Sequence, residues 1–346
     1  MPPTPPGRVR RPPAWSIALV AAAAAALYLG LPRLAGLQET WGRLSTGDPL
    51  WLAAAALFEA GSYAAYVLTF HRLFAPRSAR IGWQESYDIS LAGVAATRLL
   101  ATGGAGGIAL TIWALRRSGM HRRELLSGLT TFYVALYGIF MGALVLAGAG
   151  LWTGLLAGPA PFGLTVVPAL FGGLAIAAAL TIAMVPPGAA GGVRHRPRGW
   201  KAVTRRLGTL TAAVAAMAAG VRGAVELLRE RDAALLGALG WWAFDVAVLA
   251  ACFEAFGETP PGGVVVMAYF TGMLGNLLPI PGGLGGVEGG MIGAFLAFGV
   301  DAGLAVAVVL AYRAFAYWLP MIPAAFAYLR LVRTVAGWDT ARDPTG

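Results

Sequence analysis

The chain has 346 residues, of which 58% are hydrophobic and 12% are charged, and its mean hydropathy is +0.68. A soluble domain carries about 25% charged residues, so this composition excludes a cytosolic enzyme, a disordered protein and a disulfide-rich secreted domain. A net charge of +10 would suit a nucleic-acid-binding protein, but the basic residues lie between apolar segments, where they set membrane topology. The sequence therefore predicts an all-α, polytopic membrane protein.

Six apolar segments are long enough to cross a bilayer, whose hydrocarbon core of about 30 Å needs about 20 residues of helix. The first, 14–31, follows three arginines and is interpreted as a retained transmembrane helix, because it is longer than the apolar part of a signal peptide. The last is expected to kink at Pro320 and Pro323. The five full spans after the first are predicted at 49–70, 125–150, 164–185, 233–256 and 303–332.

Two further segments are apolar only in halves that are too short to cross the bilayer. In the first, 87–101 and 108–115 flank the sequence TGGAGG; in the second, 264–278 and 291–298 flank PIPGGLGG. Each segment predicts a re-entrant hairpin in which a helix breaks at a glycine-rich tip and a second helix returns. Basic residues flank the first hairpin and are missing next to the second, so the first opens to the cytoplasm and the second to the outside.

A shorter apolar stretch, 207–221, has cationic residues on both sides and predicts an interfacial or re-entrant cytoplasmic helix rather than a span. Of the 26 Lys and Arg residues, 22 fall in the predicted cytoplasmic loops and tails. Cytoplasmic loops of membrane proteins are enriched in Lys and Arg. This asymmetry predicts a protein of the cell membrane with its N-terminus and its C-terminus in the cytoplasm.

The two glycine-rich tips share the pattern G-G-x-G-G, at 103–107 and at 282–286. Because the hairpins have opposite orientations, the units of about 49–150 and 232–333 are predicted to form an inverted repeat. They would lie within one membrane domain, 1–333, which a short polar tail follows. Inverted repeats are typical of secondary transporters, which bind substrate where broken helices meet near the bilayer midplane. The alternative is that the glycines only allow helices to pack closely.

The run NLLPIPGGLGGVE, from Asn276 to Glu288, resembles the signature of the lysylphosphatidylglycerol synthetase transmembrane family, the flippase-like membrane domain of bacterial multiple peptide resistance factors. Arg313 before Pro320 also fits, whereas Thr102 stands where relatives often have proline. The resemblance implies a domain that moves aminoacylated or other anionic-headgroup lipids between leaflets. Family members with synthetase activity carry an additional soluble domain, so this chain is not expected to be an enzyme.

Charged groups inside apolar segments are the first candidates for a site, because inserting each costs about 2.5–3.5 kcal/mol. Arg98 would either clamp a lipid phosphate or pair with a buried carboxylate. Glu288 would either bind a cationic headgroup or a coupling proton, or form an ion pair with Arg313. Glu59 and Asp245 are expected to form hydrogen bonds between helices.

The predicted translocation site combines the ionisable groups with the two tips. The helix after Gly286 would also direct its positive end at the midplane and so offer an anion site. No metal-binding or cofactor motif occurs, and neither kind of group is expected. The predicted site residues are Arg98, Gly103, Gly104, Gly106, Gly107, Asn276, Pro279, Pro281, Gly282, Gly283, Gly285, Glu288 and Arg313.

These features together predict a translocase that moves an anionic or aminoacylated phospholipid, or a polyprenyl-linked lipid, between leaflets. Its partners would be membrane lipids and not nucleic acid, and a homo-oligomer is left open. Two alternatives remain. One is a transporter of small anions that is coupled to protons through Glu288. The other is a non-transporting membrane partner of a separate lipid-modifying enzyme.

Overall fold

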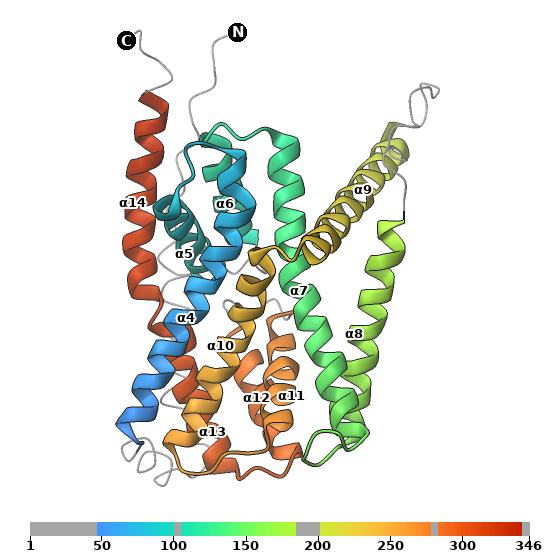
Figure 1. Cartoon of the computed structure of the whole chain (residues 1–346), viewed down its shortest axis with the longest axis vertical. Coiled ribbons are helices and arrows are strands. Elements are labelled where there is room, and N and C mark those ends of the chain that lie inside the picture. The colour runs from blue at the N-terminus through green and yellow to red at the C-terminus, as the bar shows by residue number, and fades with distance from the viewer. Residues whose placement is uncertain (1–46, 100–104, 185–200, 278–282, 341–346) are drawn as a thin grey trace.

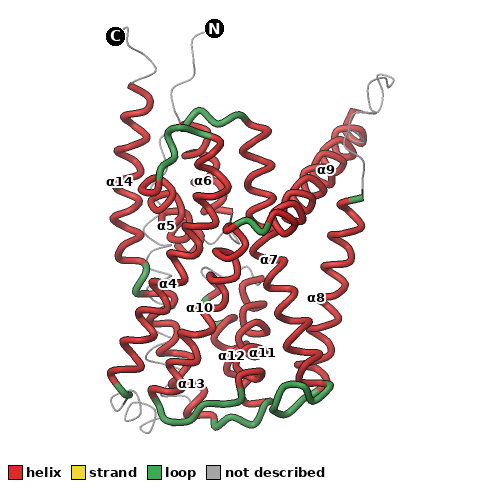
Figure 2. Tube along the Cα trace, in the orientation of Figure 1, coloured by secondary structure: helices red, strands yellow, loops and turns green. Residues whose placement is uncertain are grey.

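The computed structural model describes residues 47–99, 105–184, 201–277 and 283–340. Within these ranges the chain is helical and has no strand, which confirms the all-α prediction (Figures 1 and 2). The helices are α4 Pro49–Phe74, α5 Trp83–Leu99, α6 Ala105–Arg117, α7 Arg122–Trp152, α8 Phe162–Ala183, α9 Lys201–Glu230, α10 Ala233–Ala255, α11 Gly262–Met273, α12 Gly286–Ala297, α13 Ala302–Arg313 and α14 Met321–Thr340.

Five helical segments are long and apolar enough to cross a membrane, and they match the last five of the six predicted spans. They are Pro49–Arg77, Arg122–Trp152, Phe162–Ala183, Ala233–Ala255 and Ala302–Trp338. The predicted first span, 14–31, lies outside the described residues, and so do five of the predicted site residues: Gly103, Gly104, Pro279, Pro281 and Gly282.

Both predicted hairpins are present, and the chain enters them from opposite ends of the molecule. Helices α5 and α6 lie side by side in the upper half of Figure 1, and the chain enters and leaves this pair at the top. Helices α11 and α12 lie side by side in the lower half, and the chain enters and leaves them at the bottom. A short 3-10 helix, Leu274–Leu277, extends α11 towards the tip. Each half-helix is therefore confined to one half of the molecule.

Glycines allow the two arms of each hairpin to touch backbone to backbone. A Cβ atom on Gly107 of α6 would lie 2.3 Å from the carbonyl oxygen of Gly93 in α5. A Cβ atom on Gly275 would lie 2.3 Å from the carbonyl oxygen of Gly286 at the start of α12. Small residues permit this close approach of transmembrane helices. Close packing was the alternative to a substrate-binding role for the glycines. Gly107 and Gly275, at or next to the two tips, do pack closely.

Helices α4 and α10 form the antiparallel pair at the centre of the molecule (Figure 1). The Thr69 hydroxyl donates to the Ala234 carbonyl at 3.1 Å, and the Ser62 hydroxyl donates to the Trp241 carbonyl at 2.9 Å. Both hydroxyls are buried and satisfied by backbone of the opposite helix. These two contacts fix the register in which residues of α4 face residues of α10.

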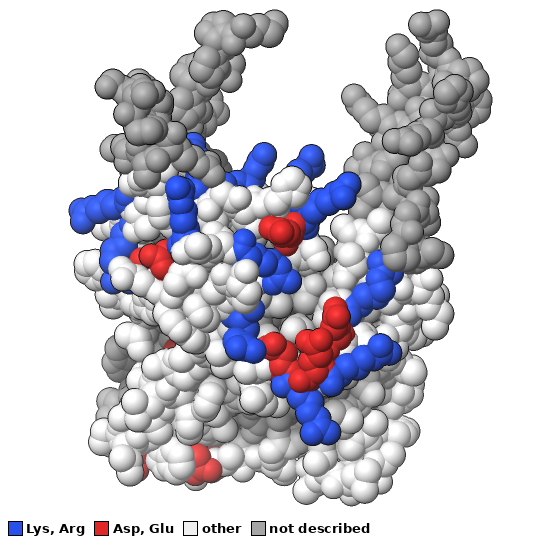
Figure 3. Space-filling view, turned by 45° about the horizontal axis from the view of Figure 1, so that its top comes forward, with Lys and Arg blue, Asp and Glu red and all other residues white. Residues whose placement is uncertain are grey.

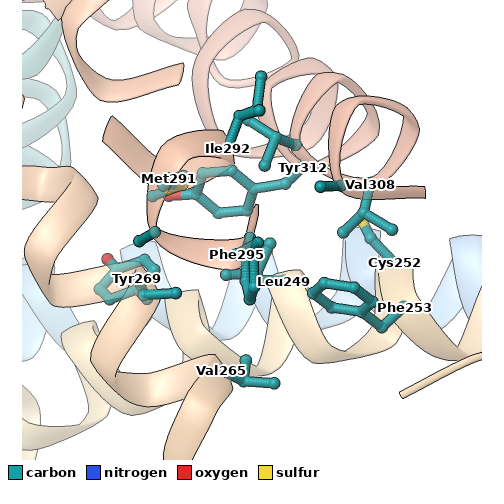
Figure 4. Close-up of a cluster of buried hydrophobic side chains, with 14 of the residues drawn as sticks. Leu249, Cys252, Phe253, Val265, Tyr269, Met291, Ile292, Phe295, Val308 and Tyr312 are labelled. Carbon is teal, nitrogen blue, oxygen red and sulfur yellow. The ribbon is translucent and has the colours of Figure 1, made fainter. Parts of the chain in front are cut away.

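A hydrophobic cluster joins the second hairpin to α10 and α13, and Figure 4 shows its centre. Phe253 of α10 meets Phe295 of α12 edge to face, with ring centroids 4.9 Å apart. Leu249, Cys252 and Val308 are fully buried around them. The second hairpin is therefore held by apolar packing as well as by the polar contacts described below.

Two predicted boundaries differ from the structure. The apolar stretch 207–221 is the middle of a 30-residue helix, α9, which lies obliquely against α7 and α8 and is not among the five candidate spans (Figure 1). The last helix continues to Thr340, within the segment predicted as a tail. In both cases hydropathy located the apolar part of a helix and not its ends, because Arg and Lys are themselves good helix formers.

The last span also breaks earlier than its prolines predicted. After α13 the chain forms a π-helix, Ala314–Trp318, and α14 starts only at Met321. Pro320 has no N–H group to bond the carbonyl of Ala316 four residues before it. The regular hydrogen bonding of the helix is thus lost before Pro320 itself.

Charged side chains are distributed unequally between the two ends of the molecule. Figure 3 shows Lys and Arg gathered over the end where α6 joins α7 and where α14 ends. At the opposite end, the connections 153–161, 256–261 and 298–301 contain two acidic residues and no basic one. This agrees with the charge asymmetry on which the predicted orientation rests, while the orientation itself stays a prediction.

The close approach within the hairpins predicts that the same substitution is destabilising at some glycines and tolerated at others. We expect Gly107→Ala and Gly275→Ala to lower the free energy of unfolding by about 1–3 kcal/mol, because the new methyl groups meet backbone. Gly289→Ala, in α12, is the control, since no atom lies within 4 Å of its added Cβ. Thermal unfolding of the three variants in detergent measures the difference. Equal melting temperatures would contradict the packing role.

Candidate functional site

A cavity of about 410 Å³ lies where both hairpins approach the central helices. Its wall includes residues of α4, α5, α6, α7, α10, α11 and α13, and of the segments that follow α11 and α13. Eight of the predicted site residues are described by the structure, and five of these line the cavity: Arg98, Gly107, Asn276, Gly283 and Arg313. Gly106 is next to Gly107 in the chain, Gly285 is two residues after Gly283, and Glu288 contacts Arg313.

Arg98, near the end of α5, reaches across the cavity to the second half of the chain. Its guanidinium group donates one hydrogen bond to the Ala316 carbonyl at 2.8 Å and another to the Tyr317 carbonyl at 2.9 Å. The guanidinium carbon also lies 5.0 Å from the centre of the Tyr317 ring. The sequence suggested a lipid phosphate or a buried carboxylate as the partner of Arg98, and the structure shows two backbone carbonyls of the π-helix instead.

Pro320 explains why a carbonyl of the π-helix is available to Arg98. In an unbroken α-helix the Ala316 carbonyl would accept a hydrogen bond from the N–H group of residue 320. Proline has no such group, and a buried carbonyl without a partner costs about 1–3 kcal/mol. Arg98 supplies the missing donor, so the side chain that stabilises the break in the last span comes from the first hairpin.

Glu288 and Arg313 form a buried ion pair, which is one of the two roles that the sequence predicted for Glu288. The Arg313 Nε atom lies 2.5 Å from Glu288 Oε1, and the two side chains are 6% and 0% exposed. Glu288 Oε2 accepts a hydrogen bond from the N–H group of Gly285 at 2.7 Å. The carboxylate thus occupies the positive end of α12, where the sequence predicted an open anion site.

Tyr317 lies between the two hairpins and contacts both cationic groups. The guanidinium carbon of Arg313 is 4.4 Å from the centre of its ring, and that of Arg98 is 5.0 Å away. Such cation–π contacts add about 0.5–2 kcal/mol each. The π-helix therefore receives Arg98 through its carbonyls and both arginines through one aromatic ring.

The two carboxyl groups at mid-helix differ in their partners. Asp245 accepts hydrogen bonds from the hydroxyls of Tyr312, at 3.1 Å, and of Tyr269, so it joins α10 to α11 and α13 as expected. Glu59 is only 4% exposed, and its Oε2 atom has no hydrogen-bond partner. The sequence predicted that Glu59 forms hydrogen bonds between helices, and within the described residues its Oε2 atom forms none.

Sequence reasoning missed the aromatic part of the cavity wall. It considered ionisable groups and glycines, whereas α7 and α10 contribute several large rings. Tyr133 and Tyr137 lie four residues apart in α7, which places them on one helix face, and this spacing was the available signal. The aromatic residues that line the cavity are Tyr66, Phe70, Phe132, Tyr133, Tyr137, Trp241, Trp242, Tyr312 and Tyr317.

The cavity reaches the surface of the described structure beside α6 and α7. Ile108 of α6 is 37% exposed and Tyr137 of α7 is 53% exposed, although both line the cavity. Both helices are apolar, and α7 is a candidate membrane span. The exposed part of the cavity wall therefore includes residues of two apolar helices, and we refer to it as the opening beside α6 and α7.

The chain matches the family model described as the lysylphosphatidylglycerol synthase TM region over residues 15–324. It therefore belongs to this family of multi-pass membrane proteins, and this membership indicates a function related to membrane lipids. Two relatives, each named UPF0104 membrane protein and both from Methanothermobacter thermautotrophicus, are 40% identical over 85 residues and 34% identical over 79 residues. The matched segments cover 24% and 22% of this chain and 24% of each relative, so the match spans about a quarter of their length.

The Glu288–Arg313 pair predicts a strong difference between single and double substitutions. Glu288→Met and Arg313→Met should each lower the free energy of unfolding by about 3–5 kcal/mol, because each leaves one buried charge without its partner. The double variant should recover most of this loss. Arg72→Met is the control, since Arg72 is exposed and its surface pair with Asp232 contributes little to stability. Chemical unfolding in detergent measures all four, and additive losses would contradict the coupling.

Proposed function

We propose that this member of the lysylphosphatidylglycerol synthase transmembrane family translocates lipids. Its substrate would be an anionic or aminoacylated phospholipid, or a polyprenyl-linked lipid, which it moves from one leaflet to the other. The observation that supports this most is the cavity at the meeting point of two oppositely oriented hairpins, with Arg98 in its wall. The chain would catalyse no chemical reaction. It would lie in the cell membrane with both termini in the cytoplasm.

The size and the wall of the cavity suit a lipid headgroup. Its volume of about 410 Å³ is within the range of about 300–1,000 Å³ that is usual for small-molecule sites. The opening beside α6 and α7 would let the headgroup enter while the acyl chains stay in the bilayer. The aromatic rings would cover the glycerol region, because Tyr and Trp combine an apolar surface with one polar atom.

Arg98 is the group best placed to bind a headgroup phosphate. The positive charge of Arg313 is balanced by Glu288, and the positive end of α12 is occupied by the same carboxylate. The hydrogen bonds of Arg98 go instead to neutral carbonyls, so a phosphate in the cavity can take their place. A guanidinium group binds phosphate through two parallel hydrogen bonds, which are stronger than bonds to a neutral carbonyl.

Exchange of partners at Arg98 provides a mechanism for alternating access. A phosphate that takes the two N–H groups of Arg98 releases the carbonyls of Ala316 and Tyr317. The contact between the first hairpin and the π-helix is then broken, and the two halves can move relative to each other. When the headgroup leaves, Arg98 returns to the carbonyls and the halves close again.

Scrambling of fluorescent headgroup-labelled lipids in proteoliposomes tests the proposal. The wild type should move labelled lipid between leaflets faster than empty vesicles do. Arg98→Gln keeps donors for a carbonyl and loses the charge, so the rate should fall roughly tenfold or more, since a charged hydrogen bond contributes about 1.5–3 kcal/mol. Arg116→Gln, at an exposed position on α6, is the control and should leave the rate unchanged.

Three lipids with anionic, zwitterionic and lysyl headgroups should be compared, each in wild type and in both variants. If the wild type moves none of them above the empty vesicles, lipid translocation is contradicted. Uptake of a small anion driven by a pH gradient would then point to an ion transporter. If the wild type shows neither lipid movement nor anion uptake, a non-transporting scaffold for a separate lipid-modifying enzyme is the remaining function.

A further inference from the structure

A pair of carboxyl groups, Glu59 and Asp245, is buried beside the cavity where α4 crosses α10. The register of the two helices brings them together: Thr69 contacts Ala234, Ser62 contacts Trp241, and one further turn along both helices places Glu59 opposite Asp245. Glu59 is 4% exposed and Asp245 is 8% exposed. The two groups interact electrostatically with each other and with Arg98.

The surrounding hydrogen bonds separate the roles of the two carboxyl groups. Asp245 accepts bonds from the hydroxyls of Tyr269 and Tyr312, and donors of this kind stabilise a carboxylate. No donor in the described part of the chain bonds Glu59 Oε2. A buried carboxylate oxygen without a hydrogen bond is far more costly than the oxygen of a neutral acid.

A count of the buried charges leads to the same assignment. Glu288 and Arg313 neutralise each other. Arg98 then supplies one positive charge, which balances one of the two remaining carboxyl groups. The groups that face Glu59 are Asp245 of α10, Arg98 of α5, and the hydroxyls of Tyr63 and Tyr312. Among the described residues, Arg98 is the one cation that acts on Glu59. Arg313 also acts on Asp245, but its charge is balanced by Glu288, so one of the two carboxyl groups is left to be neutral.

We propose that Glu59 is a proton-binding site that is coupled to the anion occupancy of the cavity. In the conformation described, Asp245 carries the negative charge and Glu59 holds the proton. An anion bound to Arg98 takes up the balancing positive charge, which makes a negative charge on Glu59 still less favourable. Binding of an anion and binding of a proton therefore favour each other, as linkage requires. The link to lipid anions rests on the proposed function, whereas the proton site does not.

Infrared difference spectroscopy of the full chain in phosphatidylcholine nanodiscs tests the site directly. A protonated carboxyl group has its own C=O stretching band, which should be present in the wild type at neutral pH and absent in Glu59→Gln. Glu124→Gln, at an exposed position of α7, is the control and should keep the band. In Asp245→Asn, Glu59 becomes the partner of Arg98, so its band should disappear at a lower pH than in the wild type.

Addition of glycerol phosphate to the wild type tests the coupling, and the band should then persist to a higher pH. Absence of a band that Glu59→Gln removes would overturn the proton site, whether or not the protein moves lipids. A band that is insensitive to Asp245→Asn would overturn the charge argument. A band that is insensitive to glycerol phosphate would overturn the coupling and remove the Arg98–phosphate contact from the proposed function.

Discussion

A transmembrane helix that breaks frees backbone carbonyls, and hydrocarbon offers them no donor. In this protein the break before Pro320 leaves the Ala316 carbonyl without its usual partner. Arg98 of the first hairpin donates the hydrogen bond that replaces it. This requirement joins two segments more than 200 residues apart in the sequence. It also helps to decide where a cationic group can remain inside an apolar protein, since two hydrogen bonds to carbonyls hold Arg98 there, in addition to its electrostatic interaction with Asp245 and Glu59.

Charge balance is the second constraint on the site, and it acts on every ionisable group near the cavity. The Glu288 carboxylate neutralises Arg313 and occupies the end of α12, so neither of these two groups is open to a ligand. Asp245 is stabilised by tyrosine hydroxyls, and Glu59 is not. The difference leaves Arg98 as the anion-binding candidate and Glu59 as the proton-binding candidate.

Hydropathy and charge were sufficient to predict most of the fold. A long apolar run must be a helix in a membrane, and two short runs around glycines must be a hairpin, so the five described spans and both hairpins followed from the sequence. The helix ends at α9 and α14 did not follow, because Arg and Lys end an apolar run without ending a helix.

The composition of the site was predictable to a smaller degree than its location. Arg98, Glu288 and Arg313 were found because buried charge is rare, and the Glu288–Arg313 pair followed from their opposite signs. The true partner of Arg98 depends on a missing N–H group and a π-helix, and the aromatic wall depends on how seven helices meet. Such contacts arise from tertiary packing, which no local pattern in the chain encodes.

The contacts of both hairpins converge on one short segment, which makes that segment the natural pivot of the molecule. The first hairpin reaches the π-helix through Arg98, and the second reaches Arg313, the residue before the π-helix, through Glu288. Tyr317 contacts both arginines. A single π-helical turn inserts one residue into the regular bonding of an α-helix, and such turns are frequent at functional sites. A conformational change that separates the hairpins therefore has to rearrange residues 313–320, whichever ligand drives it.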